Sequence, residues 1–335
     1  CMIVQKGIII IAILLLTVVK AYHPAYSFKD DSQKAVERYY GQLSGKVTQD
    51  TFRELDKSIK ELEQQQDNIK KDAEKNGSDD VSQQIAYISQ RIDVIKQVEE
   101  YAQKLSVREQ EEGIKAYIIP QEPYESFLEP TTSIISNNLL SILSIFFLML
   151  LVSGVWPYEN QKNMVHQLKA SLKGRRQLQR SKLFCCVVSA ILVWGICSSY
   201  QIYAVIHEGR LLENIHAPVQ NLVLMSDFPY KISICQFLIL FYGIRAAVLI
   251  STSFLIYFIS TYAKKTEQSI VLNFSFIVLP AAVSIMGKID MGYFSLLKAV
   301  RLVQLIGGGQ WAIAIVLLAG MAAVIGSSYN LRTRT

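Results

Sequence analysis

Long apolar runs separated by polar connectors are the main pattern of the chain. Crossing about 30 Å of hydrocarbon takes roughly 20 helical residues. Six runs approach or exceed this length: 3–21, 134–156, 183–206, 232–263, 270–286 and 311–327. Together with a hydrophobic content of 51%, they exclude an ordinary soluble domain. The pattern predicts an all-α, polytopic membrane protein with six transmembrane helices.

Three of these runs carry a further signal. The first resembles a secretory signal, but Lys20 interrupts the cleavage site, so we expect an uncleaved signal-anchor helix. The fourth is too long for one untilted span, and Gly243 with Arg245 predicts a break into an interfacial helix plus a span. The fifth contains Pro280, which predicts a kink whose freed carbonyl needs a neighbouring donor.

The longest polar region, 22–133, has helical periodicity of its own. Apolar residues recur at heptad-like steps over 48–75 and again over 81–105. Between them, residues 76–80 supply a helix stop followed by an N-cap. We expect an antiparallel helical hairpin that projects about 40 Å. Its role as a spacer or cap and its role in binding a substrate or partner are both open.

Lysine and arginine set the expected topology, because they gather in the cytoplasmic connectors of membrane proteins. They are concentrated in 157–182, in 264–269 and in the tail. We therefore expect a multi-pass protein of a bacterial plasma membrane with both termini in the cytoplasm. The expected domains are a first transmembrane helix (1–21), an extracytoplasmic helical domain (22–133), and transmembrane helices two to six (134–335) with a cytoplasmic coupling segment at 157–182.

The charge distribution limits the possible partners. Residues 22–133 hold 15 Lys and Arg against 22 Asp and Glu, although the whole chain carries a formal charge of +6. The basic excess therefore belongs to the membrane part, where anionic lipid headgroups account for it, so we expect membrane lipid and no nucleic acid as a partner. None of the five cysteines lies in 22–133, and their spacing predicts neither a disulfide framework nor a metal site.

The basic connector 157–182 also has an amphipathic pattern. Met164, Leu168 and Leu172 share one helical face, whereas Lys162 and His166 lie on others. This predicts a short helix along the membrane surface, ended by Gly174 and followed by a basic run into the third span. The simple interpretation is the positive charge that any cytoplasmic connector carries. The alternative is a lever through which a soluble partner moves the membrane part.

The same connector resembles that of type-2 ABC transporter permeases. It has a glutamate at the membrane edge (Glu159), a short helix (168–172), a small residue with a basic cluster (174–176) and Ser181-Lys182 before the third span. It departs from the common pattern at Asn163, where many members have glycine, and it lacks a proline before the basic cluster.

The resemblance implies a permease that exports a peptide, lipid or drug-like solute by alternating access. It implies two partners besides lipid: an ABC ATPase subunit, which binds the ATP and magnesium, and a second permease copy or a homologous permease. The residues expected to couple to the ATPase are Glu159, Lys162, Met164, His166, Leu168, Leu172, Arg175, Arg176, Arg180 and Lys182.

The sequence predicts no enzyme chemistry and no cofactor or metal in this chain. Residues 41–47 nearly match a phosphate-binding loop, but the spacing and the missing hydroxyl indicate an ordinary loop. Polar groups within the apolar runs mark a possible substrate path: Asn137, Asn138, Arg245, Asn273 and Ser275. Arg245 has two interpretations: it contacts an anionic or amphiphilic substrate, or it snorkels to the interface at the broken start of the fourth span. We favour snorkelling. A membrane sensor or scaffold whose hairpin binds a ligand is the alternative function.

Overall fold

The computed structural model describes residues 39–76, 80–121, 123–124, 136–157, 172–207, 209–279 and 310–333. The structure is mainly helical, as predicted, with one small sheet that the sequence did not predict. It divides into two compact units. The helical unit comprises Cys1–Ala25, Glu129–Tyr200 and Ile239–Thr335, and the hairpin unit comprises Tyr26–Leu128 and Gln201–Leu238.

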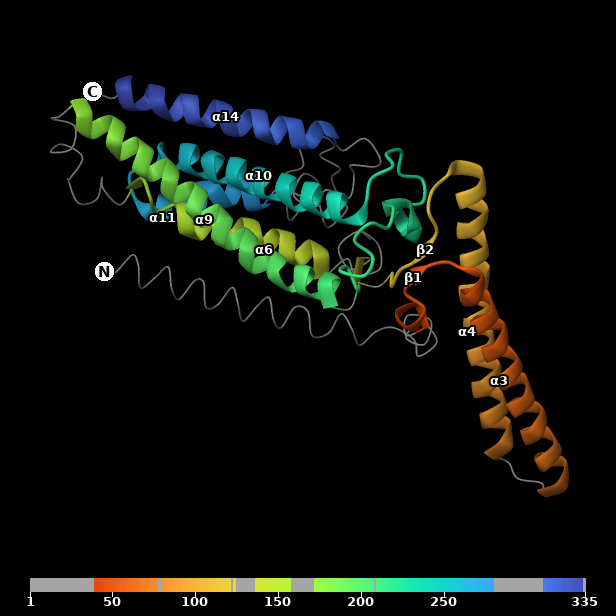
Figure 1. The fold of residues 1–335 in the computed structure, drawn as a ribbon. Coiled ribbons are helices and arrows are strands. Elements are labelled where there is room, and N and C mark those ends of the chain that lie inside the picture. Colours follow the sequence, from red (N-terminus) through yellow and green to blue (C-terminus); the bar gives the residue numbers. More distant parts are fainter. Residues whose placement is uncertain are drawn as a thin grey trace. The chain divides into compact units, whose positions relative to one another are not determined.

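Two long helices dominate the hairpin unit. Helix α3 (Gln49–Asn76) and helix α4 (Asp80–Glu112) pack side by side in opposite directions (Figure 1). Their bounds agree with the periodicity at 48–75 and 81–105, although α4 continues seven residues further. The predicted apolar seam is the core between them, formed by Leu55, Ile59, Leu62, Ile88, Ile92, Ile95, Val98, Ala102 and Leu105. Burying each large side chain contributes about 1.5–3 kcal/mol.

A two-stranded sheet closes the base of this hairpin. Strands β1 (Gly45–Lys46) and β2 (Tyr117–Ile118) are antiparallel, with Gly45 opposite Ile118. Gly113 ends α4 with φ +68° and donates its N–H to the Glu109 carbonyl, 3.2 Å away, which is a left-handed helix cap. The segment 41–47 therefore contains a strand and is not only a loop.

The chain between α9 and α10 completes the hairpin unit. It contains two 3₁₀ helices, η2 (Val219–Asn221) and η3 (Val223–Met225). The Gln220 amide donates to the carbonyls of Phe228 and Tyr230 at 3.2 and 2.7 Å. These contacts give the segment a fixed conformation despite its lack of long helices or strands.

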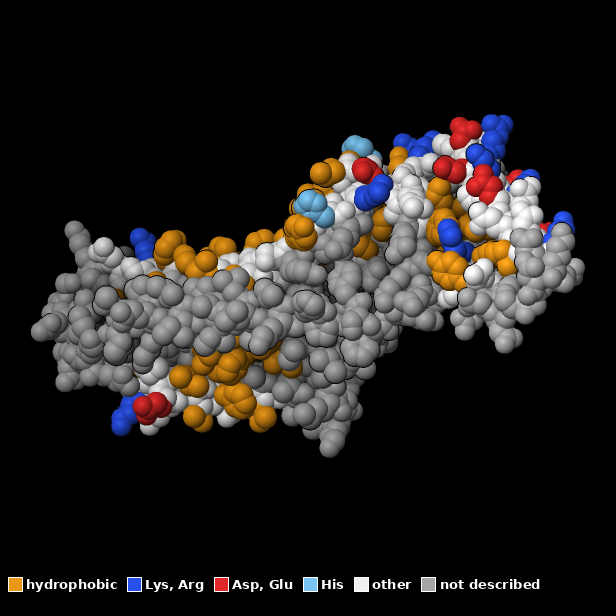
Figure 2. All heavy atoms as spheres, turned by 90° about the horizontal axis from the view of Figure 1, so that it is seen from below, with side chains coloured by type: hydrophobic (Ala, Val, Ile, Leu, Met, Phe, Trp, Pro, Cys, Tyr) orange, Lys and Arg blue, Asp and Glu red, His pale blue; other side chains and the backbone are white. Residues whose placement is uncertain are grey.

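The helical unit contains the apolar helices. They are α6 (Ser136–Val152), α9 (Leu172–His207, which continues into the hairpin unit), α10 (Ile234–Ser260), α11 (Thr266–Asn273), the π-helix η4 (Phe274–Val278) and α14 (Gln310–Thr333). Among the described residues, Gln177–Ser199 and Ile234–Ser260 are long and apolar enough to cross a membrane, and Ile142–Val152 and Ile313–Ser327 are shorter apolar helices. Hydrophobic side chains cover the described flanks of this unit (Figure 2). The run 3–21 lies outside the described residues, and the six spans and their topology stay predictions.

Two details of the fourth and fifth runs differ from expectation. Helix α10 is continuous through Gly243 and Arg245, so the predicted break is wrong. Open space surrounds the position of a Gly243 Cβ, and an unbroken helix keeps every backbone hydrogen bond, which hydrocarbon demands. In the fifth run, the helix widens into η4 ahead of Pro280, which itself lies outside the described residues.

Candidate functional site

The predicted coupling residues fall on both sides of the start of α9. Glu159, Lys162, Met164, His166 and Leu168 lie outside the described residues. Leu172, Arg175 and Arg176 lie in the first turns of α9, followed by the exposed Arg180 and the buried Lys182. Gly174 was expected to end a surface helix, but it lies inside α9. The basic run and the third apolar run therefore form one uninterrupted helix.

Lys182 anchors this helix to two others. Its residue is only 5% exposed, and its Nζ lies 4.2 Å from the centre of the Trp156 ring, in the turn after α6. The Trp156 ring meets Tyr257 of α10 edge-on, with ring centres 6.1 Å apart. A desolvated cation over an indole ring is stabilised by about 2 kcal/mol. The stack links α9, α6 and α10 at the basic end of the helical unit.

A buried polar cluster continues from this stack. Ser260 follows Tyr257 by about one helical turn, and its Oγ accepts hydrogen bonds from Ser269 Oγ at 2.8 Å and from Asn273 Nδ2 at 3.1 Å. All three residues are fully buried. Asn273 then leads directly into the π-helix η4, a distortion that often occurs at functional sites. We call Trp156, Lys182, Tyr257, Ser260, Ser269 and Asn273 the basic-end junction.

The predicted substrate path is not assembled at one place. Asn137 and Asn138 lie in the first turn of α6, and about 20 Å of helix separates Asn138 from the end of α6 at Val152. Asn273 belongs to the basic-end junction, and Ser275 is exposed. The structure thus separates these polar groups along the length of the helical unit.

Arg245 occupies a different position from the one expected. It is 4% exposed and lies in the middle of α10, so snorkelling at a helix start is wrong. Glu267, at the start of α11, is the one carboxylate in the described part of the helical unit. The guanidinium is therefore a buried charged group within an apolar helix.

A second set of polar contacts, absent from the sequence prediction, lies in the hairpin unit. Gln121 is its centre: its Oε1 accepts from the Val223 N–H at 3.0 Å, and its amide donates to the Ile119 carbonyl at 2.9 Å. The Tyr101 hydroxyl donates to the Asn221 carbonyl, and the Asn221 amide donates to the Lys115 carbonyl at 2.9 Å. We call Ser44, Tyr101, Gln121, Asn214 and Asn221 the loop clamp. They bind the base of the hairpin to the chain between α9 and α10.

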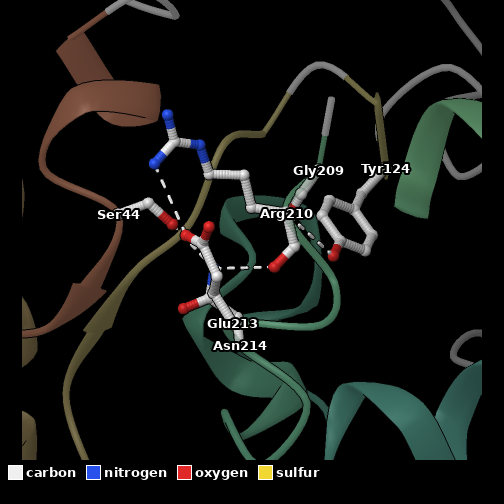
Figure 3. Close-up of polar contacts among 6 residues, drawn as sticks. All are labelled: Ser44, Tyr124, Gly209, Arg210, Glu213 and Asn214. Carbon is white, nitrogen blue, oxygen red and sulfur yellow. Dashed lines mark hydrogen bonds and ion pairs between the residues drawn. The ribbon is translucent and has the colours of Figure 1, made fainter. Parts of the chain in front are cut away.

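The other end of the loop clamp is shown in Figure 3. Asn214 donates its amide to Ser44 Oγ at 2.7 Å and to the Arg210 carbonyl at 3.3 Å. Arg210 has φ +45°, a left-handed conformation that costs about 1 kcal/mol or more, and its guanidinium pairs with Glu213 at 3.4 Å. Beside it, Gly209 has no room for a side chain, because a Cβ would lie 2.6 Å from the Val205 carbonyl oxygen.

Burial changes the acidity of two tyrosines in the hairpin unit. It raises the pKa of Tyr101 and the pKa of Tyr124 well above the ordinary value for a phenol. The Tyr124 hydroxyl donates to the Gly209 carbonyl at 3.3 Å. A phenol is protonated at neutral pH in any case, and the raised pKa keeps both hydroxyls as hydrogen-bond donors to a higher pH than usual.

Comparison of the chain with protein-family models, curated proteins and solved structures finds no match. The connector's own residues and the contacts at the basic-end junction are therefore the features from which a function can be inferred. Four members of the junction were not among the predicted site residues: Trp156, Tyr257, Ser260 and Ser269. A tryptophan at the end of one apolar run and a lysine at the start of the next were the available signal.

Proposed function

We propose that the chain is the membrane-spanning permease subunit of an ATP-driven transporter of the type-2 ABC kind. It works with a separate ATPase subunit and with a second copy of itself or a homologous permease. The observation that carries the proposal is that α9 runs unbroken from the basic segment at Leu172 into the apolar span Gln177–Ser199. A force applied to the connector is therefore delivered to a rigid rod.

The basic-end junction supports a mechanism for this coupling. Lys182 ties the rod to Trp156 after α6, and Trp156 contacts Tyr257 of α10. Ser260 then ties α10 to α11 through Ser269 and Asn273. A movement of α9 thus displaces α6, α10 and α11 together, which alternating access requires. The connector would enter a groove of the ATPase, which binds the ATP and magnesium.

Arg245 supports an anionic or amphiphilic solute. A guanidinium in the middle of a spanning helix costs several kcal/mol when it faces lipid, and Arg245 is instead buried between helices. A peptide carboxylate, a lipid phosphate or an acidic drug has the charge to pair with this guanidinium. Family members mostly export, so outward transport of such a solute is the proposed direction.

Reconstituted vesicles test the coupling. The complex is purified with its ATPase, and ATP-driven movement of a labelled acidic peptide, an anionic fluorescent lipid and a cationic dye is measured. Glu159→Ala and Arg175→Ala should each lower transport and leave membrane insertion intact. Arg53→Ala is the matched control, since Arg53 is an exposed arginine of α3 and should have no effect. Unaltered transport in both connector variants would contradict the proposed lever.

A sensor or scaffold is the second candidate, and the loop clamp favours it. Gln121 and Asn221 bind the hairpin base to the segment that joins the two apolar helices α9 and α10. A ligand that bends the hairpin would therefore pull on this segment without any solute crossing the membrane. This function predicts a signalling enzyme at the inner face in place of an ATPase.

A further inference from the structure

The last turns of α9 and the chain that joins it to α10 expose several large apolar side chains. Between residues 203 and 230, which we call the connecting segment, the exposed members are Leu212 (73% exposed), Tyr230 (62%), Tyr203 (55%), Val223 (50%) and Leu224 (38%). Figure 2 shows hydrophobic side chains gathered beside histidines in the described surface. An isolated exposed apolar residue is normal, whereas a contiguous apolar patch marks an interaction surface.

The inner side of the connecting segment is already occupied. Val219, Leu222 and Met225 are buried in the hairpin unit, and the backbone between them is bound by the loop clamp through Gln121. The exposed side chains therefore cannot turn inward without breaking these contacts. Their surface needs a partner from outside the unit.

Connectivity identifies that partner. Tyr203 lies one helical turn beyond the apolar span Gln177–Ser199, and Tyr230 lies four residues before the span Ile234–Ser260. Tyrosines at both ends of spanning helices form the aromatic belt at the membrane–water boundary. Exposed Arg210 and Lys231 accompany the apolar side chains, and long cationic side chains of this kind reach lipid headgroups while their stems cover apolar surface.

We propose that the connecting segment lies in the headgroup and upper acyl region of the bilayer, with lipid as the occupant of its apolar surface. The inner side of the same segment holds the hairpin base, so the bilayer surface fixes the orientation of the hairpin. The inference depends on the membrane placement within the proposed function, but not on the ATPase or on transport.

Brominated lipids, which quench tryptophan emission on contact, test this placement. The full chain is reconstituted in phosphatidylcholine vesicles with and without bromine on the acyl chains. Two substitutions add a tryptophan to the connecting segment, Val223→Trp and Tyr230→Trp. Two controls of matched residue type and exposure add one to α4: Val107→Trp at 49% and Tyr87→Trp at 61%. Tyr87 lies about 38 Å of helix away from the end of α4 at Glu112.

The added emission should be lost in brominated vesicles at 223 and 230 and retained at 107 and 87. Tryptophan emission retained at all four positions would overturn the proposal. If, in that case, aqueous iodide fails to quench the tryptophans at 223 and 230, a protein partner covers them. Equal loss at all four positions would also overturn it. The unsubstituted chain reports insertion, because its three tryptophans, Trp156, Trp194 and Trp311, all lie in the helical unit. Emission of this chain that bromine leaves unchanged would contradict the membrane placement itself. Quenching at 223 and 230 without ATP-driven transport would leave this inference intact and contradict only the transport function.

Discussion

The contact between Lys182 and Trp156 makes the sharpest quantitative prediction. Lys182→Met keeps an unbranched apolar stem and removes the charge, and Trp156→Leu keeps an apolar side chain and removes the ring. A double-mutant cycle of the two isolates their interaction, because each single variant carries its other losses into the double variant. Trp156→Leu also removes the edge contact between Trp156 and Tyr257, which is worth about 0.5–1.5 kcal/mol. This loss occurs in both the single and the double variant, so it cancels from the coupling energy.

The structure sets the expected size of that interaction. Nζ lies 4.2 Å from the ring centre, and both residues are at least nine-tenths buried, so the pair belongs with desolvated cation–π contacts of about 2 kcal/mol. The expected coupling energy is therefore about 1–2 kcal/mol. The two single variants should lose more than this, because Lys182 has other contacts and Trp156 fills space among the helices.

Denaturant unfolding in detergent micelles, followed by far-UV circular dichroism, measures the four free energies of unfolding. A second cycle with Arg180→Met and Trp156→Leu is the control, because Arg180 lies on the same helix but is exposed. Its coupling should be zero within about 0.5 kcal/mol. A Lys182 coupling no larger than that of Arg180 would refute the idea that this stack fastens α9 to α6.

Three further predictions concern packing, acidity and substrate. Gly320→Ala should destabilise the protein by about 1–3 kcal/mol, because the added Cβ would lie 2.6 Å from Ser251 Cβ. Gly195→Ala is the control, because open space surrounds the position of its Cβ. In the same unfolding measurement it should leave the stability unchanged or raise it by up to about 1 kcal/mol. Burial raises the pKa of Tyr101, so as the pH rises this phenol ionises in the unfolded chain before it ionises in the native one. The contribution of Tyr101 to the free energy of unfolding should therefore be complete below about pH 10 and fall above it. Tyr101→Phe should reduce this fall when unfolding is measured against pH, and an unchanged slope would contradict a raised pKa at Tyr101. Arg245→Gln should reduce transport of an anionic solute much more than that of a cationic one, whereas Arg245→Lys should retain part of the selectivity; equal effects on both solutes would exclude a substrate contact.

The hairpin was predictable because one local pattern determines it. Its two helices bury their own apolar seam, so the spacing of Leu55, Ile59 and Leu62 is sufficient to find α3. The loop clamp was not predictable in this way. Gln121 bonds to residues about a hundred positions away, and no local periodicity reports such a pairing between a side chain and a distant backbone.

Glycine caused the main errors in the membrane part. The sequence predicts a helix stop at Gly174 and a break at Gly243, yet both residues lie inside continuous helices. Glycine within a helix costs roughly 1 kcal/mol or less, whereas breaking a helix in hydrocarbon leaves backbone groups unpaired at several kcal/mol each. The larger penalty prevails at Gly243. The error also misplaced Arg245, which was assigned to a helix start that does not exist.

Purification of the complex from native membranes separates transport from sensing. The chain is isolated with a C-terminal tag under mild detergent, and the associated proteins are identified and counted. The proposed function predicts one ATPase per permease chain, cross-linked to the chain within residues 157–182. A complex that contains a kinase or an envelope enzyme and no ATPase, or an ATPase that never cross-links to this segment, would contradict it.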